Sequence, residues 1–161
     1  NDVVGPKFLV DSMLGRLATW LRILGFDAAS VRDSQRRRML ERSFLERRIL
    51  LTREAKLARA HAFRLILIPQ EYWPDQLAHL WAELKMARVN PGDLFTLCTE
   101  CNAPLEKLEK DKLDPKRVPT KVWGHQSKYF SCPRCRKIFW PGSHVDSSLL
   151  RLKDLGIVKD S

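Results

Sequence analysis

The four cysteines of this chain fall in two Cys-x-x-Cys pairs, Cys98/Cys101 and Cys132/Cys135, and no cysteine lies outside them. Two thiolates three residues apart can bind one metal ion from a single tight turn, and two such turns complete a tetrahedral zinc site. The alternatives are two disulfides or a redox Cys-x-x-Cys, but neither needs two matched pairs, and no signal peptide indicates an oxidising compartment. The pattern therefore predicts a structural zinc site in a small β ribbon.

Upstream of the cysteines, short apolar runs alternate with segments of helical periodicity. Such an alternation predicts an α/β fold with a parallel sheet and helices on both faces. The Asn90-Pro91-Gly92 break divides the chain into an α/β domain over about 7–90 and a zinc ribbon with a C-terminal helix over 95–161. The predicted strands are 7–11, 28–32, 49–52 and 65–68, and the predicted helices are 13–24, 34–48, 54–62, 74–86 and 147–155.

The net charge of +10 is concentrated in one stretch, because residues 32–64 hold eleven Lys/Arg against four Asp/Glu. A concentrated basic patch attracts polyanions. Nucleic acid is the expected partner and a membrane is not, because no apolar run approaches the ~20 residues of a membrane span and no lipid-seeking segment stands out. Within the predicted helix 34–48, the expected inner face consists of Met39, Leu40, Phe44 and Leu45.

Three acidic residues, Asp11, Asp33 and Glu54, follow predicted strands. The carboxyl ends of neighbouring parallel strands meet at one crevice, so these side chains can converge there. Converging carboxylates bind Mg²⁺ or Mn²⁺, which activates water in phosphodiester cleavage. Alternatively, Asp11 and Asp33 cap the helices that follow them, and Glu54 favours a helix N-terminus by its charge.

Several of these motifs resemble one known family. The stretch 7–27, which opens Lys-Phe-Leu-Val-Asp, the run 49–54, and the ribbon with Trp140-Pro-Gly-Ser-His144 are similar to the Mut-seven C-terminal RNase family. The resemblance implies a PIN-like nuclease fold followed by a zinc ribbon. In animals such a domain lies C-terminal to a 3′–5′ exonuclease domain in mutator- and Nibbler-type proteins of small-RNA silencing, and the absence of an initiator methionine fits an excised domain.

One departure from the family changes the expected function. The resemblance leads us to expect Asp-x-x-Asp at the start of the second helix, but here Asp33 is followed by Ser34, Gln35 and Arg36. An arginine repels a metal ion and favours RNA phosphate. We therefore expect an RNA-binding accessory domain with a degenerate nuclease site. Two alternatives for the domain are an active Mg²⁺- or Mn²⁺-dependent nuclease site and a module that docks the exonuclease on silencing factors. For the arginines alone, the alternative is an ordinary solvated basic helix face.

The ribbon carries a second set of cations with aromatic residues between them, among them Trp123, Tyr129 and Trp140. This arrangement is found in single-strand binders that stack bases, although the aromatics of a small ribbon also serve for packing. The expected partners are single-stranded RNA and a protein of the silencing machinery, and the expected location is the cytoplasm, including perinuclear RNA granules. The predicted RNA contacts are Arg32, Arg36, Arg37, Arg38, Arg42, Arg47, Arg48, Lys121, Lys128, Arg134, Arg136, Lys137 and His144.

Overall fold

A four-stranded parallel sheet with strand order β2-β1-β3-β4 forms the first part of the molecule. The computed structural model describes residues 5–31 and 35–160, apart from the side chains of Ser143 and His144. The central strands β1 (Phe8–Val10) and β3 (Ile49–Thr52) are buried at every position because both faces of the sheet are covered. The flanking elements are β2 (Ala28–Ser30), β4 (Arg64–Leu67), α1 (Gly15–Ile23), α2 (Arg36–Glu46) and α3 (Trp73–Leu84).

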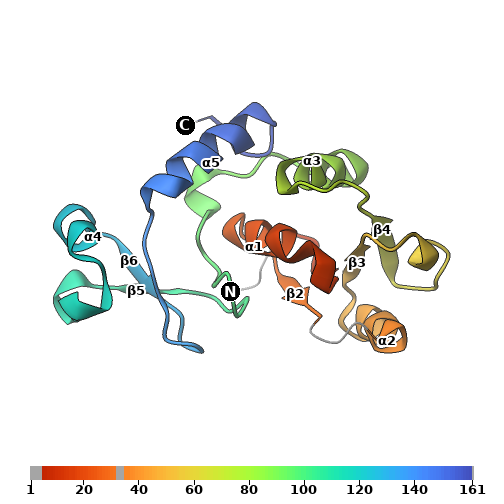
Figure 1. The fold of residues 1–161 in the computed structure, drawn as a ribbon, viewed down its shortest axis with the longest axis horizontal. Coiled ribbons are helices and arrows are strands. Elements are labelled where there is room, and N and C mark those ends of the chain that lie inside the picture. The colour runs from red at the N-terminus through yellow and green to blue at the C-terminus, as the bar shows by residue number, and fades with distance from the viewer. Residues whose placement is uncertain (1–4, 32–34, 161) are drawn as a thin grey trace.

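Helices lie on both sides of this sheet, with α1 and α3 on one face and α2 on the other (Figure 1). The larger core lies under α1 and α3 and includes Leu17 and Leu80, and Trp20 stacks on Trp73 at its margin with ring centroids 4.3 Å apart. The smaller core lies under α2 around Met39. The predicted α/β fold, a parallel sheet flanked by helices and followed by a small β ribbon, is confirmed.

The inner face of α2 differs from the prediction. Met39 is buried as expected, but Phe44 is 52% exposed and Leu45 is 84% exposed. The buried residue one turn after Met39 is Ser43, whose hydroxyl donates to the Arg48 carbonyl oxygen at 2.7 Å. Phe44 lies about 100° around the helix from Ser43, and Leu45 about 200°. Apolar spacing was right for Met39 and for Leu40, which packs against the same core, and wrong for Phe44 and Leu45, because a serine fills the next inward position.

Two predicted helix boundaries also differ from the structure. The segment 54–62 holds only a short 3-10 helix, Ala55–Leu57, and Leu57 is its one buried residue, which is too little apolar surface to stabilise a full helix. The last helix, α5 (Ser143–Asp154), begins four residues before the predicted start at position 147.

The ribbon is a three-stranded antiparallel sheet with strand order β5-β6-β7. Its small core surrounds Tyr129, whose ring centroid lies 6.3 Å from that of Trp123 and 6.4 Å from that of Trp140. Tyr129 is fully buried and the two tryptophans pack against the core, so these aromatics serve packing. The elements are β5 (Glu106–Leu108), α4 (Thr120–His125), β6 (Tyr129–Ser131) and β7 (Ile138–Phe139).

Helix α5 returns from the ribbon to the first part of the molecule (Figure 1). Leu152, Ile157 and Val158 belong to the larger core under α1 and α3, and Val158 pairs with Val89 in a parallel bridge. The C-terminal segment therefore connects the two sheets. Within residues 5–31 and 35–160, no helix combines the length and the apolar character needed to cross a membrane.

Candidate functional site

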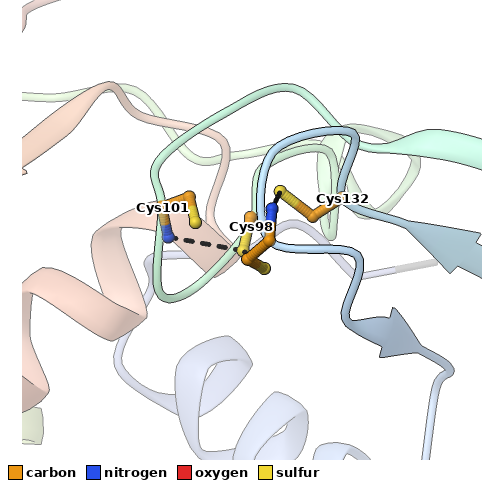
Figure 2. Close-up of side chains that lie close together, drawn as sticks. Cys98, Cys101 and Cys132 are labelled. Carbon is orange, nitrogen blue, oxygen red and sulfur yellow. Dashed lines mark hydrogen bonds between the residues drawn. The ribbon is translucent and has the colours of Figure 1, made fainter.

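The two cysteine pairs meet at one point. The four Sγ atoms lie within 4.8 Å of one another, and those of Cys98 and Cys135 are 3.8 Å apart. A zinc ion with Zn–S bonds of ~2.3 Å needs sulfurs about 3.8 Å apart. All four cysteines are free thiols, so neither disulfide of the alternative prediction is formed. Figure 2 shows Cys98, Cys101 and Cys132 gathered between two backbone loops. The cluster can bind a structural zinc ion.

The two metal-binding turns have the same backbone geometry. The residue after each second cysteine is left-handed, with φ of 62° at Asn102 and 67° at Arg136. Each of these residues donates its N–H to the carbonyl oxygen of the first cysteine, Asn102 to Cys98 and Arg136 to Cys132, both at 2.9 Å. This repeated turn brings two sulfurs of a pair to one side of the loop, as a shared metal ion requires.

Two backbone N–H groups lower the pKa of the Cys132 thiol. Burial raises the pKa of this thiol, but the N–H groups of Cys135 and Arg134, 3.5 and 3.4 Å from the sulfur, lower it, and the pKa falls to about 7. In contrast, a hydrogen bond with Cys135, together with burial, raises the pKa of Cys101 to about 12. The lowered value at Cys132 favours the thiolate, which is the form that binds zinc.

Arg22 connects the first cysteine turn to the parallel sheet. Its side chain lies on α1 and is 6% exposed. The guanidinium donates from Nε to the Ala28 carbonyl at 2.8 Å, from Nη1 to the Thr99 carbonyl at 2.6 Å and from Nη2 to the Ser30 hydroxyl at 2.9 Å. Burial lowers the pKa of Arg22, and the nearby Cys98, Cys101 and Asp27 oppose this effect. One buried side chain thus holds β2 and the Cys98–Cys101 turn together.

A second connection runs through Asn102 and Asp27. The Asn102 amide donates to Asp27 Oδ1 at 2.5 Å, and its Oδ1 accepts the N–H of Ala28 at 3.0 Å. Asp27 also accepts from Arg48 at 2.7 Å. Burial raises the pKa of Asp27, but its hydrogen bonds to Arg48 and Asn102 outweigh burial, so the pKa is lowered. The ion pairs continue from Arg48 to Glu46 at 2.8 Å, which joins the cysteine turn to the end of α2.

The carboxyl edge of the sheet brings together two of the three predicted carboxylates. Asp11 is buried at the end of β1, and Asp11 Oδ2 accepts from the Thr52 hydroxyl at 2.9 Å. The same hydroxyl oxygen accepts the N–H of Glu54 at 3.0 Å. Asp33 and Arg32 lie outside the described residues. Within the described part, the cysteines are the only group of three or more residues placed to share a metal ion.

Arg36 occupies the position at which the resemblance leads us to expect a metal-binding carboxylate. Its Nη2 lies 3.2 Å from Glu54 Oε1, so the two side chains form an ion pair across the carboxyl edge. Half of each side chain remains exposed, at 52% for Arg36 and 44% for Glu54. The arginine therefore places a positive charge beside Glu54, the exposed one of the two described carboxylates that were predicted at this edge.

The predicted RNA-contacting arginines fall into two groups. Arg48 is 12% exposed and is held by Asp27 and Glu46, and Arg42 pairs with Glu46. These two side chains belong to the network that joins α2 to the sheet. The exposed group lies along the outer side of α2, where Arg37 contacts Glu41 at 3.5 Å with 91% of its side chain exposed. The other exposed members are Arg36, Arg38 and Arg47.

The predicted RNA contacts of the ribbon whose side chains the structure describes are on its surface. Lys137 pairs with Glu100 at 2.6 Å beside the cysteine cluster, and its pKa is raised by this hydrogen bond. His144 belongs to the first turn of α5, but its side chain lies outside the described residues. The remaining predicted contacts are exposed, namely Lys121, Lys128, Arg134 and Arg136.

A family model described as the Mut7-C RNAse domain matches residues 6–151, nearly the whole chain. The chain belongs to this family. Searches of curated proteins and of solved structures found no match. Membership of the Mut7-C RNAse domain family gives the chain a nuclease-related or RNA-binding role.

Within the Mut7-C RNAse domain, sequence reasoning missed the roles of Arg22 and Asp27. The signal for Arg22 was its place on the apolar side of α1, next to Leu21 and four residues after Ala18, both of which are buried. A charged residue at such a position needs buried partners. Those partners include Thr99, which lies 77 positions away in the sequence. The sequence could therefore predict that Arg22 needs buried partners, but not which residues they are.

Proposed function

We propose that this domain binds single-stranded RNA as an accessory part of a 3′–5′ exoribonuclease, and that its own carboxylate site no longer cleaves RNA. The Arg36–Glu54 ion pair at the carboxyl edge carries this proposal. A divalent cation bound there needs anionic oxygen ligands. The guanidinium neutralises Glu54 and repels a second cation. Of the three predicted carboxylates, Asp11 is the other one that the structure describes, and it is buried and hydrogen-bonded to Ser12 and Thr52.

The exposed arginines of α2 support RNA binding. A guanidinium can give two parallel hydrogen bonds to one phosphate, and its charge is present at every physiological pH. Arg36, Arg37 and Arg38 stand on three consecutive positions in the first turn of α2, next to the carboxyl edge. The ribbon carries further exposed cations, among them Lys121, Lys128 and Arg134.

We assign a structural role to zinc at Cys98, Cys101, Cys132 and Cys135. Four thiolates complete the coordination of the ion, so no position is left for a substrate or for water. Zinc supplies folding free energy to small modules that lack a large core, and the described core of this ribbon has four buried residues. The residues around the cluster, Arg22 and Asn102, hold the metal-binding turn in place on the sheet.

Reversing the charge at Arg36, Arg37 and Arg38 to Glu should lower the affinity for single-stranded RNA by at least about tenfold, because hydrogen bonds to charged groups contribute about 1.5–3 kcal/mol each. The slope of log affinity against log salt should become shallower by up to about 2, at ~0.7 per phosphate. Fluorescence anisotropy with a labelled oligonucleotide measures both. The buffer should lack Mg²⁺ and Mn²⁺, since a carboxylate at position 36 is itself a cation ligand.

The matched control for this reversal is Arg16→Glu, Arg151→Glu and Lys159→Glu. These three residues are exposed and lie outside α2 and the ribbon sheet. The control makes the same change in net charge, so it should retain most of the affinity. Equal losses in the two triple variants would show that net charge alone attracts RNA. Unchanged affinity in the α2 variant would refute binding through these arginines.

The second candidate function is that of an active nuclease. The hydroxyl of Thr52 supports it, because it holds both the Asp11 carboxylate and the backbone of Glu54 at the carboxyl edge. We expect the purified domain with Mn²⁺ to leave labelled single-stranded RNA intact, as judged by gel electrophoresis. A metal titration followed by NMR should show no shift at Asp11. Cleavage that Asp11→Asn abolishes would establish the enzyme instead and overturn the proposed degeneracy.

We further propose, from family membership and the stated resemblance, that the parent protein acts in small-RNA silencing. The expected partners are a 3′–5′ exonuclease domain in the same chain and a protein of the silencing machinery, in cytoplasmic RNA granules. Crosslinking of RNA to the full-length protein in cells, followed by sequencing, tests this context. Small RNAs should be enriched over messenger and ribosomal fragments. Recovery of longer RNAs alone would contradict the proposed role in silencing, but it would agree with the proposed RNA binding.

A further inference from the structure

Two phenylalanines stand exposed at the far end of α2. Phe44, in the last turn of the helix, is 52% exposed, and Phe63, directly before β4, is 49% exposed. Exposing half of a phenylalanine ring forgoes part of the ~1.5–3 kcal/mol that its full burial supplies. Neither ring belongs to the smaller core under α2 or packs against it. Both rings therefore present apolar surface for which the described fold provides no cover.

A hydrogen bond holds the backbone of Phe63 against the last turn of α2, which carries Phe44. The Phe63 N–H donates to the Ser43 hydroxyl at 3.2 Å, and this hydroxyl donates to the Arg48 carbonyl at 2.7 Å. The start of β4 thus lies against the last turn of α2, where Ser43 is the neighbour of Phe44. Because the serine contacts are made by the backbone of Phe63, its side chain is left to the surface.

Two exposed arginines lie close to these phenylalanines in the sequence. Arg47 ends α2 with a left-handed φ of 53°, and Arg64 follows Phe63 at the start of β4. Neither forms an ion pair with a carboxylate of the described residues. The carboxylate nearest to Arg47 in the sequence, Glu46, is already held by Arg42 and Arg48. Phe44 and Arg47, three positions apart at the end of α2, therefore place an exposed ring and an uncompensated positive charge together. Arg64 pairs with Ile49 and belongs to the other face of the sheet, under α1 and α3.

We propose that Phe44 and Phe63 stack unpaired bases of single-stranded RNA whose phosphates contact Arg47. Aromatic rings beside cations are the two components of sequence-tolerant single-strand binding. This inference rests on the proposed RNA-binding function and deepens it. Phe44 lies eight residues from Arg36, or about 12 Å along the helix axis. The bound strand runs along α2, from the arginines at the carboxyl edge to the two rings at the opposite end.

The test compares two labelled probes of equal length, a uridine oligoribonucleotide and its abasic counterpart, in buffers of the same salt. Phe44→Leu and Phe63→Leu keep apolar bulk but remove the aromatic face. Each should weaken binding of the uridine probe by about 5- to 150-fold, the range for loss of one stacked base. Affinity for the abasic probe should stay at the value of the unmodified domain. Leu45→Ala, at an 84% exposed position on another side of α2, is the surface control and should change neither affinity.

A second readout is direct. RNA carrying 5-iodouridine forms photocrosslinks to aromatic rings that stack on it, and peptide mapping should place them at Phe44 or Phe63. If both leucine variants bind the uridine probe as the unmodified domain does, stacking is refuted, and the rings then serve a protein partner. An equal loss with the abasic probe also refutes it. If the unmodified domain binds no RNA, the proposed function fails and the stacking site fails with it.

Discussion

Replacing Cys98 with serine should reduce bound zinc from one ion per chain to almost none and unfold the ribbon. Serine is a poor ligand for zinc, and three thiolates leave the tetrahedron open. Structural zinc supplies on the order of 10–16 kcal/mol in small zinc modules, far more than the few buried residues around Tyr129 can provide. Elemental analysis gives the zinc content, and NMR should show loss of dispersed signals from β5, β6 and β7.

Cys132→Ser should give the same result, because the cluster draws two ligands from each turn. Thr99→Ser, within the first metal-binding turn but not a ligand, is the matched control. It keeps the backbone carbonyl that accepts from Arg22, so zinc content and the ribbon signals should be retained. A zinc content of one ion per chain in both cysteine variants would show that the metal binds elsewhere.

The effect should extend beyond the ribbon. The Cys98–Cys101 turn contributes the Thr99 carbonyl to Arg22 and the Asn102 amide to Asp27. When the turn unfolds, Arg22 loses one acceptor and Asp27 one of its two side-chain hydrogen-bond partners, Asn102 and Arg48. We therefore expect the stability of the parallel sheet to fall as well. The zinc site and the end of α2 are parts of one connected structure.

The sequence predicted the features that depend on local pattern. The alternation of apolar runs with helical periodicity identified all four parallel strands. The signal was clearest for β1 and β3, which are buried at every position because helices cover both faces of the sheet. The Cys-x-x-Cys spacing predicted the cluster, because its geometry lies within two short turns. Asp11 and Glu54 were predicted to share an edge because parallel strands end on the same side of a sheet.

The features that sequence reasoning missed depend on contacts between distant residues. Arg48 was predicted to face RNA together with its neighbours, but the structure gives it Asp27 and Glu46 as partners. A run of arginines does not reveal which of them has a buried acid nearby. Phe44 was assigned to the core by its spacing from Met39, whereas the inward position belongs to Ser43 because a backbone carbonyl accepts its hydroxyl hydrogen.

Replacing Arg22 with methionine should destabilise the domain by about 3–5 kcal/mol, which is the second large effect that we expect. Methionine keeps the length and apolar stem of the side chain but removes its five donors. The carbonyls of Ala28 and Thr99 and the hydroxyl of Ser30 then lose their partner in a buried setting. Hydrogen bonds to a charged group contribute about 1.5–3 kcal/mol each, and unsatisfied buried acceptors add a desolvation cost. Urea unfolding measures the change.

Arg22→Lys separates the charge from the geometry of the guanidinium. One ammonium group cannot reproduce the fork that reaches three acceptors on β2 and the cysteine turn, so lysine should recover only part of the loss. Arg16→Met, on the exposed side of the same helix, is the control and should change stability by less than ~0.5 kcal/mol. Zinc competition should also show weaker binding in Arg22→Met, because the Thr99 carbonyl is no longer held. If Arg22→Met and Arg16→Met unfold at the same urea concentration, Arg22 does not join the ribbon to the sheet, and the cysteine turn is held on β2 by Asn102 alone.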